Sequence, residues 1–380
     1  MNLSFYNFAF MEKVILKHLR IDSEIRNISE KIIEGERVTA SEALFQYEKA
    51  ELNLLGMLAH KVRSRINGKN TYFNRNFHLE PTNICIHNCR FCSYSRKMGE
   101  KDIWEYSLEE MLKIVSRYKN SNVTEVHIVG GVHPNRDLEY YGKLIQEIKK
   151  LLPDIHVKAF TAVELDHMIK KAHLSVTDGL KKLKQYGLDS IPGGGAEIFN
   201  PEIRRKICHE KSDSNTWLAI HEAAHREGIQ SNATMLYGHI ENYSHRVDHL
   251  SQLRNLQDKT NGFNAFIPLK YKNKNKLSNI EESTIIEDLK NFAVCRIFLD
   301  NIPHLKAYWP MTGKEIAQLS LEYGVDDLDG TIDDTTKIYS MAGSMEVKPG
   351  MTASDMKKLI TGAGFKPVER DSVYNIISKD

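Results

Sequence analysis

After Gly68 the sequence alternates between short strand-like runs and amphipathic helical patterns, and this alternation limits the possible folds most. The strand candidates recur roughly every 30–45 residues, and most are followed by a helical pattern. They cover residues 77–81, 125–129, 156–161, 188–191, 230–235, 265–269, 305–309 and 325–328. Such βα units form parallel sheets. We therefore predict an α/β fold with a (β/α) TIM-type barrel, full or partial; an open doubly wound sheet is the alternative.

Helical patterns flank this core. Thr39 and Glu42 form a predicted capping box within a helical stretch over 22–66, and Thr352 with Asp355 begins a helix near the C-terminus. We expect three parts: an N-terminal helical segment packed on the barrel (1–70), the barrel core (71–330) and a short closing segment (331–380).

Composition excludes several classes of protein. The 380 residues carry a net charge of only +2, which does not favour nucleic acid or a membrane surface as a partner. No stretch approaches the length of a membrane span. The first ten residues lack the basic start of a signal peptide, and Met11 is an alternative start to Met1. The five cysteines do not resemble a disulfide framework, so we expect a reducing, cytoplasmic location.

Cys85, Cys89 and Cys92 follow the first barrel strand at a C-x3-C-x2-C spacing. Three thiolates on a short loop can bind three irons of a cubane cluster and leave the fourth iron open. A structural zinc site needs a fourth ligand, and Cys208 and Cys295 lie far along the sequence with no paired spacing. A non-catalytic electron carrier is an alternative of another class, but an open iron gives it no advantage.

Polar and glycine-rich segments follow the next strands. Gly130, Gly131 and Val132 come after the second strand, and Glu164 follows the third. Three glycines and Glu197 end the fourth strand. The carboxyl ends of barrel strands carry the active site, so these loops are candidates to bind a ligand.

One motif is misleading. His221, Glu222 and His225 match the H-E-x-x-H pattern of zinc proteases, but the third histidine of a metzincin would fall at Ser231. The segment lies on a predicted helix of the outer ring, where a packed or solvated histidine pair is the better interpretation. A zinc hydrolase is the least favoured alternative.

The cysteine loop resembles the radical S-adenosylmethionine superfamily, with Phe91 in the aromatic position before the third cysteine. The resemblance implies a [4Fe-4S] cluster on Cys85, Cys89 and Cys92, and an open iron that binds S-adenosylmethionine. Reduction would then release methionine and a 5′-deoxyadenosyl radical. Many members have Gly-Gly-Glu where this chain has Gly130, Gly131 and Val132, so backbone groups would replace that carboxylate.

More narrowly, the chain is similar to the aminodeoxyfutalosine synthase family of menaquinone biosynthesis. The resemblance rests on 78–85, 130–134, 158–164, 187–199, 231–239, 245–250 and 266–269. It implies that the radical adds to the vinyl carbon of 3-[(1-carboxyvinyl)oxy]benzoate, and that rearrangement and loss of the carboxyl group give 6-amino-6-deoxyfutalosine. S-adenosylmethionine would be consumed as a cosubstrate, and a flavodoxin or ferredoxin would supply the electron. The sister enzyme, cyclic dehypoxanthinylfutalosine synthase, is the nearest alternative, and another related radical S-adenosylmethionine enzyme, such as that of deazaflavin assembly, is a further one.

A substrate with two carboxylates and an aromatic ring needs cations or hydrogen-bond donors near apolar walls. The candidate substrate residues are His133, Asn232, Tyr237 and His239, and Gly130, Gly131, Val132, Glu164, Glu197 and Phe91 are the candidates for the cofactor. Arg96 and Arg204 are possible carboxylate clamps or solvent-facing residues. The lysine-rich run 270–276 is expected to be a solvated loop.

Overall fold

The computed structural model describes residues 21–273, 279–334, 341 and 350–377. Its centre is a parallel eight-stranded sheet with the order β10-β2-β3-β4-β5-β6-β7-β8. The strands are β2 (Asn76–Leu79), β3 (Glu125–Ile128), β4 (His156–Ala159), β5 (Ser190–Ile191), β6 (Gln230–Tyr237), β7 (Phe263–Lys270), β8 (His304–Leu305) and β10 (Asp333–Asp334). From β2 to β8, neighbours in the sheet are also neighbours in the chain, as successive βα units require. The predicted TIM-type α/β fold is confirmed.

A second parallel sheet joins the two ends of the first. It has the order β11-β1-β9 and contains β1 (Asn70–Asn74), β9 (Asp327–Gly330) and β11 (Lys366–Glu369). Only Arg75 separates β1 from β2. Next to β8, the Ala307 amide donates to the Asp327 carbonyl at 2.9 Å and the Asp326 amide donates to the Leu305 carbonyl at 3.1 Å. Strand β9 therefore continues the curled sheet beyond β8 and leads into β10 at its other end.

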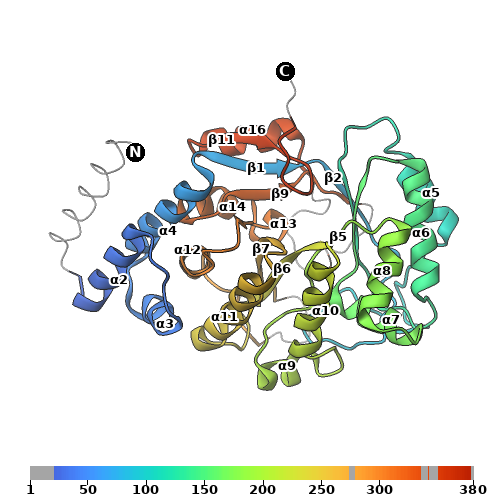
Figure 1. Ribbon diagram of the computed structural model, residues 1–380, viewed down its shortest axis with the longest axis horizontal. Helices are drawn as coiled ribbons and strands as arrows, with labels where there is room; N and C mark the ends of the chain where they lie inside the picture. Colours follow the sequence, from blue (N-terminus) through green and yellow to red (C-terminus); the bar gives the residue numbers. More distant parts are fainter. Residues whose placement is uncertain (1–20, 274–278, 335–340, 342–349, 378–380) are drawn as a thin grey trace.

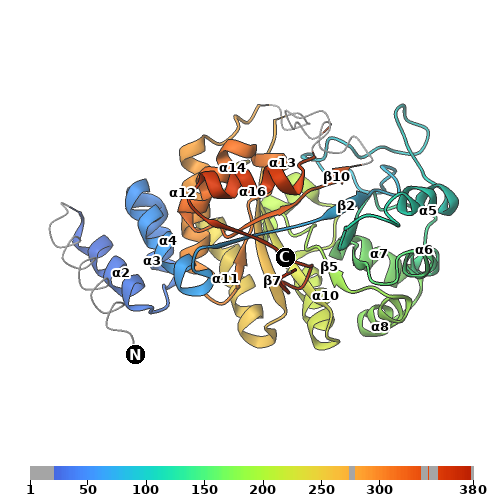
Figure 2. The ribbon, with the colours of Figure 1, turned by 90° about the horizontal axis from the view of Figure 1, so that it is seen from above.

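The helices surround this core. Figure 1 shows α2 (Ser23–Glu34), α3 (Ala40–Lys49) and α4 (Leu52–Asn67) at one end of the molecule. There, α4 packs on α12 (Ile285–Phe298). Helices α10 (Ser214–Arg226) and α11 (Tyr243–Thr260) pack against β6. Figure 2 shows α5 (Leu108–Ser116), α6 (Leu138–Leu151) and α8 (Val176–Tyr186) at the end of the molecule opposite α2. The other helices are α7 (Ala162–Lys171), α9 (Pro201–Cys208), α13 (Trp309–Thr312), α14 (Lys314–Ser320), the 3-10 helix η1 (Leu321–Tyr323) and α16 (Ala353–Gly362).

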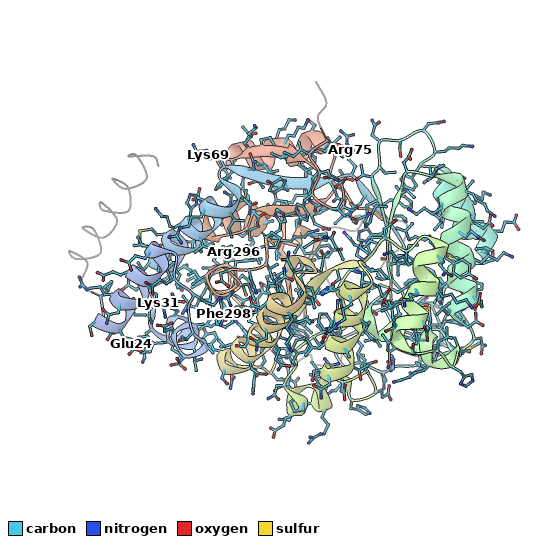
Figure 3. The ribbon with its side chains drawn as sticks, viewed as in Figure 1. Glu24, Lys31, Lys69, Arg75, Arg296 and Phe298 are labelled. Atoms are coloured by element: carbon cyan, nitrogen blue, oxygen red, sulfur yellow. The ribbon has the colours of Figure 1, made fainter. Side chains whose placement is uncertain are left out.

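Local sequence signals set several helix ends. Both predicted capping boxes are confirmed: Thr39 with Glu42 begins α3, and Thr352 with Asp355 begins α16. At the end of α12, the buried guanidinium of Arg296, labelled in Figure 3, donates to the carbonyls of Leu299 and Ile302. It thus satisfies carbonyl groups that follow the helix end. The choice between Met1 and Met11 lies outside the described residues.

The strand prediction over 305–309 was too long. Only His304 and Leu305 pair with β7, and Trp309 already begins α13 with a proline in its first turn. The Trp309 indole donates to the Gly330 carbonyl at 3.0 Å, which ties this helix to the end of β9.

Candidate active site

The loop after β2 carries the three cysteines and is bonded to the loop after β3. The Ile86 amide donates to the Val132 carbonyl at 2.9 Å. In return, the Val132 amide donates to Cys85 Sγ at 3.4 Å. Val132 therefore contacts the cysteine loop through its backbone. Contact of these backbone groups with a cofactor stays a prediction.

The glycines after β3 and β5 allow segments of the chain to approach each other. A Cβ added to Gly131 would lie 2.2 Å from the Ile84 carbonyl oxygen. At Gly193, where φ is +86°, a Cβ would lie 2.1 Å from the Asn232 carbonyl oxygen. Because these neighbours are backbone atoms, a side chain at either position would displace a strand or the cysteine loop.

Glu164 ties the glycine loop to the start of α7. Its Oε1 accepts the Gly130 amide at 3.1 Å, and its Oε2 accepts the Thr161 amide at 2.7 Å. Burial raises the pKa of this carboxyl to about 7, although these hydrogen bonds favour the ionised form. The structure thus shows a positioning contact for Glu164; its contact with a cofactor stays a prediction.

Glu197 lies just after β5 with a φ of +50° and forms an ion pair that the sequence did not suggest. The ammonium of Lys211 is 2.6 Å from Glu197 Oε1 and 5.0 Å from the centre of the Phe91 ring. Lys211 lies between α9 and α10 in a segment without a recognisable motif, so no sequence signal pointed to it.

A cavity of about 260 Å³ opens at the carboxyl ends of the strands. It is lined by Phe91, Cys92, Ser93, Tyr94, Glu197, Leu236, Leu269, Lys270, Tyr271, Lys272, Tyr308 and Met311. Apolar and aromatic side chains form most of the wall, with a cysteine and a carboxylate on one side. This combination suits a ligand with an apolar ring and a few polar groups.

Two predicted substrate residues on β6 and in the loop after it do not line this cavity. Side chains alternate along a strand, so Leu236 faces the cavity while Tyr237 faces the helices. The Tyr237 hydroxyl donates to Asp288 Oδ1 at 3.0 Å. His239 is buried behind the wall, with its ring nitrogens 3.1 Å from the Leu236 carbonyl and 3.2 Å from Glu241 Oε2.

The other two candidates also lie outside the lining. His133 Nδ1 accepts the amides of Asn135 and Arg136, and its Nε2 is 3.1 Å from Glu105 Oε1. Asn232 is buried, and its carbonyl lies against Gly193. Direct contact of any of the four with substrate stays a prediction.

The basic residues considered as clamps or loop residues have structural partners. Arg96 donates to the carbonyls of Ser93 and Ser95, and buried Arg204 donates to those of Ala196, Ile198 and Ser212. The expectation of a solvated run from residue 270 was wrong at its first residue. Lys270 ends β7, is buried and forms an ion pair with Asp288 at 2.6 Å; residues 274–278 lie outside the described ranges.

The two histidines of the H-E-x-x-H motif share one hydroxyl partner. His221 Nδ1 and His225 Nε2 each lie 2.8 Å from Ser231 Oγ, on the outer face of β6. His221 also stacks on Trp217, with 3.7 Å between the ring centres. Burial lowers the pKa of His225 to about 4, which keeps the ring neutral. The pair is thus part of the packing between α10 and the sheet.

The three loop cysteines have the chemistry that a [4Fe-4S] cluster requires. All are free thiols, Cys89 is buried and Cys92 lines the cavity. Burial raises the pKa of Cys89 to about 12, opposed by Lys211 and reinforced by Glu197 and Cys208, so iron would have to stabilise the thiolate. In the described part of the chain no three His, Cys, Asp or Glu side chains converge on one metal ion. A cubane does not require such convergence, because each of its cysteines binds a different iron.

Among the described residues, no helix is both long and apolar enough to cross a lipid bilayer.

Comparison with known proteins assigns the site to a superfamily. Residues 79–253 match the radical SAM superfamily, and residues 260–379 match the CofH/MqnC C-terminal region. Aminodeoxyfutalosine synthases from Streptomyces coelicolor and Thermus thermophilus are each 42% identical to this chain over 93% of its length. The match covers 94% of the first enzyme and 96% of the second. The cyclic dehypoxanthine futalosine synthase of Streptomyces coelicolor is 35% identical over 93% of this chain and 88% of its own.

Solved structures show the same fold at lower identity. The FeFe-hydrogenase maturase HydG from Carboxydothermus hydrogenoformans superposes with a TM-score of 0.73 at 20% identity, over 98% of this chain and 84% of its own. Methylornithine synthase superposes with a TM-score of 0.70 at 17% identity, over 89% of this chain and 96% of its own.

Proposed function

Because this chain belongs to the radical S-adenosylmethionine superfamily, in the branch with the CofH/MqnC C-terminal region, we propose that it is an aminodeoxyfutalosine synthase. It would join the 5′-deoxyadenosyl group of S-adenosylmethionine to the enolpyruvyl benzoate and form 6-amino-6-deoxyfutalosine for menaquinone biosynthesis. The observation that carries this choice is the 42% identity to two such enzymes over nearly the whole chain, against 35% to the sister enzyme.

The cysteine loop would hold the cofactor. Cys85, Cys89 and Cys92 would be the ligands of the [4Fe-4S] cluster, and Phe91 in the same loop packs against the hydrophobic core. When bound, the cluster supplies the electron that cleaves the sulfonium of S-adenosylmethionine. The Gly130–Gly131 backbone and Glu197 would hold the methionine and ribose parts of the cosubstrate.

The cavity walls would hold the aromatic substrate. Tyr271, Tyr308 and Leu236 offer flat apolar surfaces for the benzoate ring and exclude water from the reacting radical. Lys272 stands at the cavity with its ammonium 3.0 Å from Glu282 and is our candidate for a carboxylate partner. We further expect a flavodoxin or ferredoxin as reductant and a cytoplasmic location.

A product assay tests the proposal. Anaerobically reconstituted protein is incubated with reductant, S-adenosylmethionine and the enolpyruvyl benzoate, and the purine nucleoside adduct is measured by mass spectrometry. We expect the adduct from the wild-type protein and none from Cys89→Ala. If 5′-deoxyadenosine forms only with the dehypoxanthinylated nucleoside, the protein is instead the sister enzyme.

A further inference from the structure

The end of α9 and the connection to α10 support the cysteine loop. The Arg90 amide, between the second and third cysteines, donates to the Ile207 carbonyl at 2.8 Å. The Asn88 amide donates to Glu210 Oε2 at 2.5 Å. The loop that would hold the cluster therefore rests on a segment more than a hundred residues further along the chain.

Lys211 links this supporting segment to two residues of the cavity wall. Its ammonium lies over the Phe91 ring and pairs with Oε1 of Glu197 at 2.6 Å. Only 14% of the Lys211 side chain and 9% of the Glu197 side chain are exposed, so solvent screens this pair weakly. The contact fixes the Glu197 side chain at the cavity wall, beside Phe91.

The second oxygen of Glu197 remains for a ligand. In the described ranges, no hydrogen bond to Oε2 is found, whereas Oε1 faces Lys211. Glu197 lines the cavity together with Cys92. A carboxylate is an acceptor, so Oε2 suits the ammonium or ribose hydroxyl groups of S-adenosylmethionine.

We infer that Lys211 is a positioning residue for S-adenosylmethionine, which it serves by holding Glu197 through one oxygen while the other faces the cosubstrate. The inference rests on the cluster and cosubstrate of the superfamily and not on the identity of the aromatic substrate. Without its cation, Glu197 would be a nearly buried charge without a counter-ion, and its side chain would rotate away from the cavity wall. Arginine could keep the pair, because it also donates to carboxylates.

A set of variants tests this inference. Lys211→Met, Lys211→Arg, Glu197→Gln and the double variant Lys211→Met/Glu197→Gln are reconstituted, and Lys206→Met is the matched control. Lys206 is an exposed lysine on α9 whose only described bond in this region uses its backbone carbonyl. Iron content, the change in the electron paramagnetic resonance signal of the reduced cluster on adding S-adenosylmethionine, and KM and kcat for its cleavage are measured.

Lys211→Met should keep its iron but raise KM for S-adenosylmethionine about tenfold, as expected for a lost charge-assisted hydrogen bond, with a smaller change in kcat. The cosubstrate-dependent change in the spectrum should weaken in parallel. Lys211→Arg should recover most of the affinity, and Lys206→Met should match the wild type. Because Lys211 acts through Glu197, the double variant should bind no more weakly than Glu197→Gln.

Three results would overturn the inference: an unchanged KM in Lys211→Met, additive losses in the double variant, or loss of iron in both Lys211→Met and Lys211→Arg, which would show a purely structural role. Cleavage and the spectral change are measured without the aromatic substrate. A wild-type protein that binds S-adenosylmethionine but makes no adduct would therefore refute the proposed function and leave the Lys211 result intact.

Discussion

At the scale of single residues, Ser231 explains why a zinc-protease motif occurs in a protein of another class. One hydroxyl lies 2.8 Å from a ring nitrogen of both His221 and His225. A hydroxyl can donate to one nitrogen and accept from the other, so it partners both rings without a metal. The second nitrogen of His225, Nδ1, lies 2.7 Å from Thr260 Oγ1, whereas Nε2 of His221 has no hydrogen-bond partner among the described residues.

Ser231→Ala should therefore lower the free energy of unfolding by about 1–3 kcal/mol, because it leaves buried ring nitrogens without a partner. Chemical denaturation measures this loss. Ser116→Ala removes an exposed hydroxyl and should change stability by less than about 0.5 kcal/mol. If the stability lost in Ser231→Ala instead depended on whether zinc is present, the two histidines would form a metal site.

Residues that belong to a local sequence pattern could be predicted from the sequence. Residues whose role depends on where their side chains point in the folded protein could not. The spacing of Cys85, Cys89 and Cys92 lies within one loop, so no knowledge of the fold was needed. Lys211 meets Phe91 and Glu197 only after several βα units have folded, and no pattern in the sequence encodes that encounter. Tyr237 was a plausible ligand residue until the alternation of β6 placed it toward α12.

At the scale of elements, the loops after β2 and β3 form one unit held by backbone contacts. The close approach of Gly131 to Ile84 leaves no space for a Cβ atom. Gly131→Ala should displace the cysteine loop, so the purified protein should hold less than about half of the wild-type iron, with a loss of roughly 1–3 kcal/mol in stability.

Gly350→Ala is the control, because its added Cβ would lie 3.5 Å from the nearest atom of the described residues, an ordinary contact, and its φ is not positive. Iron analysis and thermal unfolding compare the two variants. Wild-type iron content in Gly131→Ala would show that the loop adapts and that this account of the glycine is incorrect.

Strands with β-branched, apolar runs were predictable, whereas strands defined by their partners were not. Strand β3 has the sequence Glu-Val-His-Ile and was found within one residue of its observed end. Strand β1 is polar and β11 contains Pro367, yet the two pair with each other. Their pairing depends on segments almost three hundred residues apart, which no local pattern shows.

At the scale of the whole molecule, the C-terminal segment is attached to the barrel by a buried ion pair. Arg370, next to β11, is fully buried, and its Nε donates to Asp327 Oδ2 on β9 at 2.6 Å. Arg370→Met should destabilise the protein by about 3–5 kcal/mol, since it leaves the buried Asp327 carboxylate without its cation, although the Asp329 amide still donates to Oδ1 at 2.6 Å. The division of the chain at residues 70 and 330 stays a prediction.

Arg226→Met is the matched control for denaturation experiments. Arg226 also pairs with a carboxylate at 2.6 Å, but 71% of its side chain is exposed, and such a pair contributes less than about 1 kcal/mol. Similar losses in the two variants would contradict the importance of burial.

Buried histidines predict an acid-sensitive fold. Burial lowers the pKa of His78 and His225 to about 4 and that of His127 and His249 to about 3. These groups stay neutral in the folded protein while the unfolded chain takes up protons below about pH 6.5. The stability they provide is thus present above pH 6.5 and is lost as the pH falls towards 4.

The free energy of unfolding should consequently fall between about pH 6.5 and 5, by up to roughly 1.4 kcal/mol per pH unit for each histidine. His225→Gln should reduce this slope by the contribution of about one proton, which is roughly 1.4 kcal/mol per pH unit. Denaturation at several pH values measures the slopes, and equal slopes in the two proteins would refute the assignment.

The central claim is that three cysteines hold a cubane whose remaining iron is open to S-adenosylmethionine. Mössbauer spectroscopy of protein reconstituted with isotopically enriched iron tests it most directly. One iron in about four should change its spectrum when S-adenosylmethionine is added. A spectrum that does not respond would contradict the claim and would point to a cluster closed by a fourth ligand, with the nearby buried thiol of Cys208 as the first candidate.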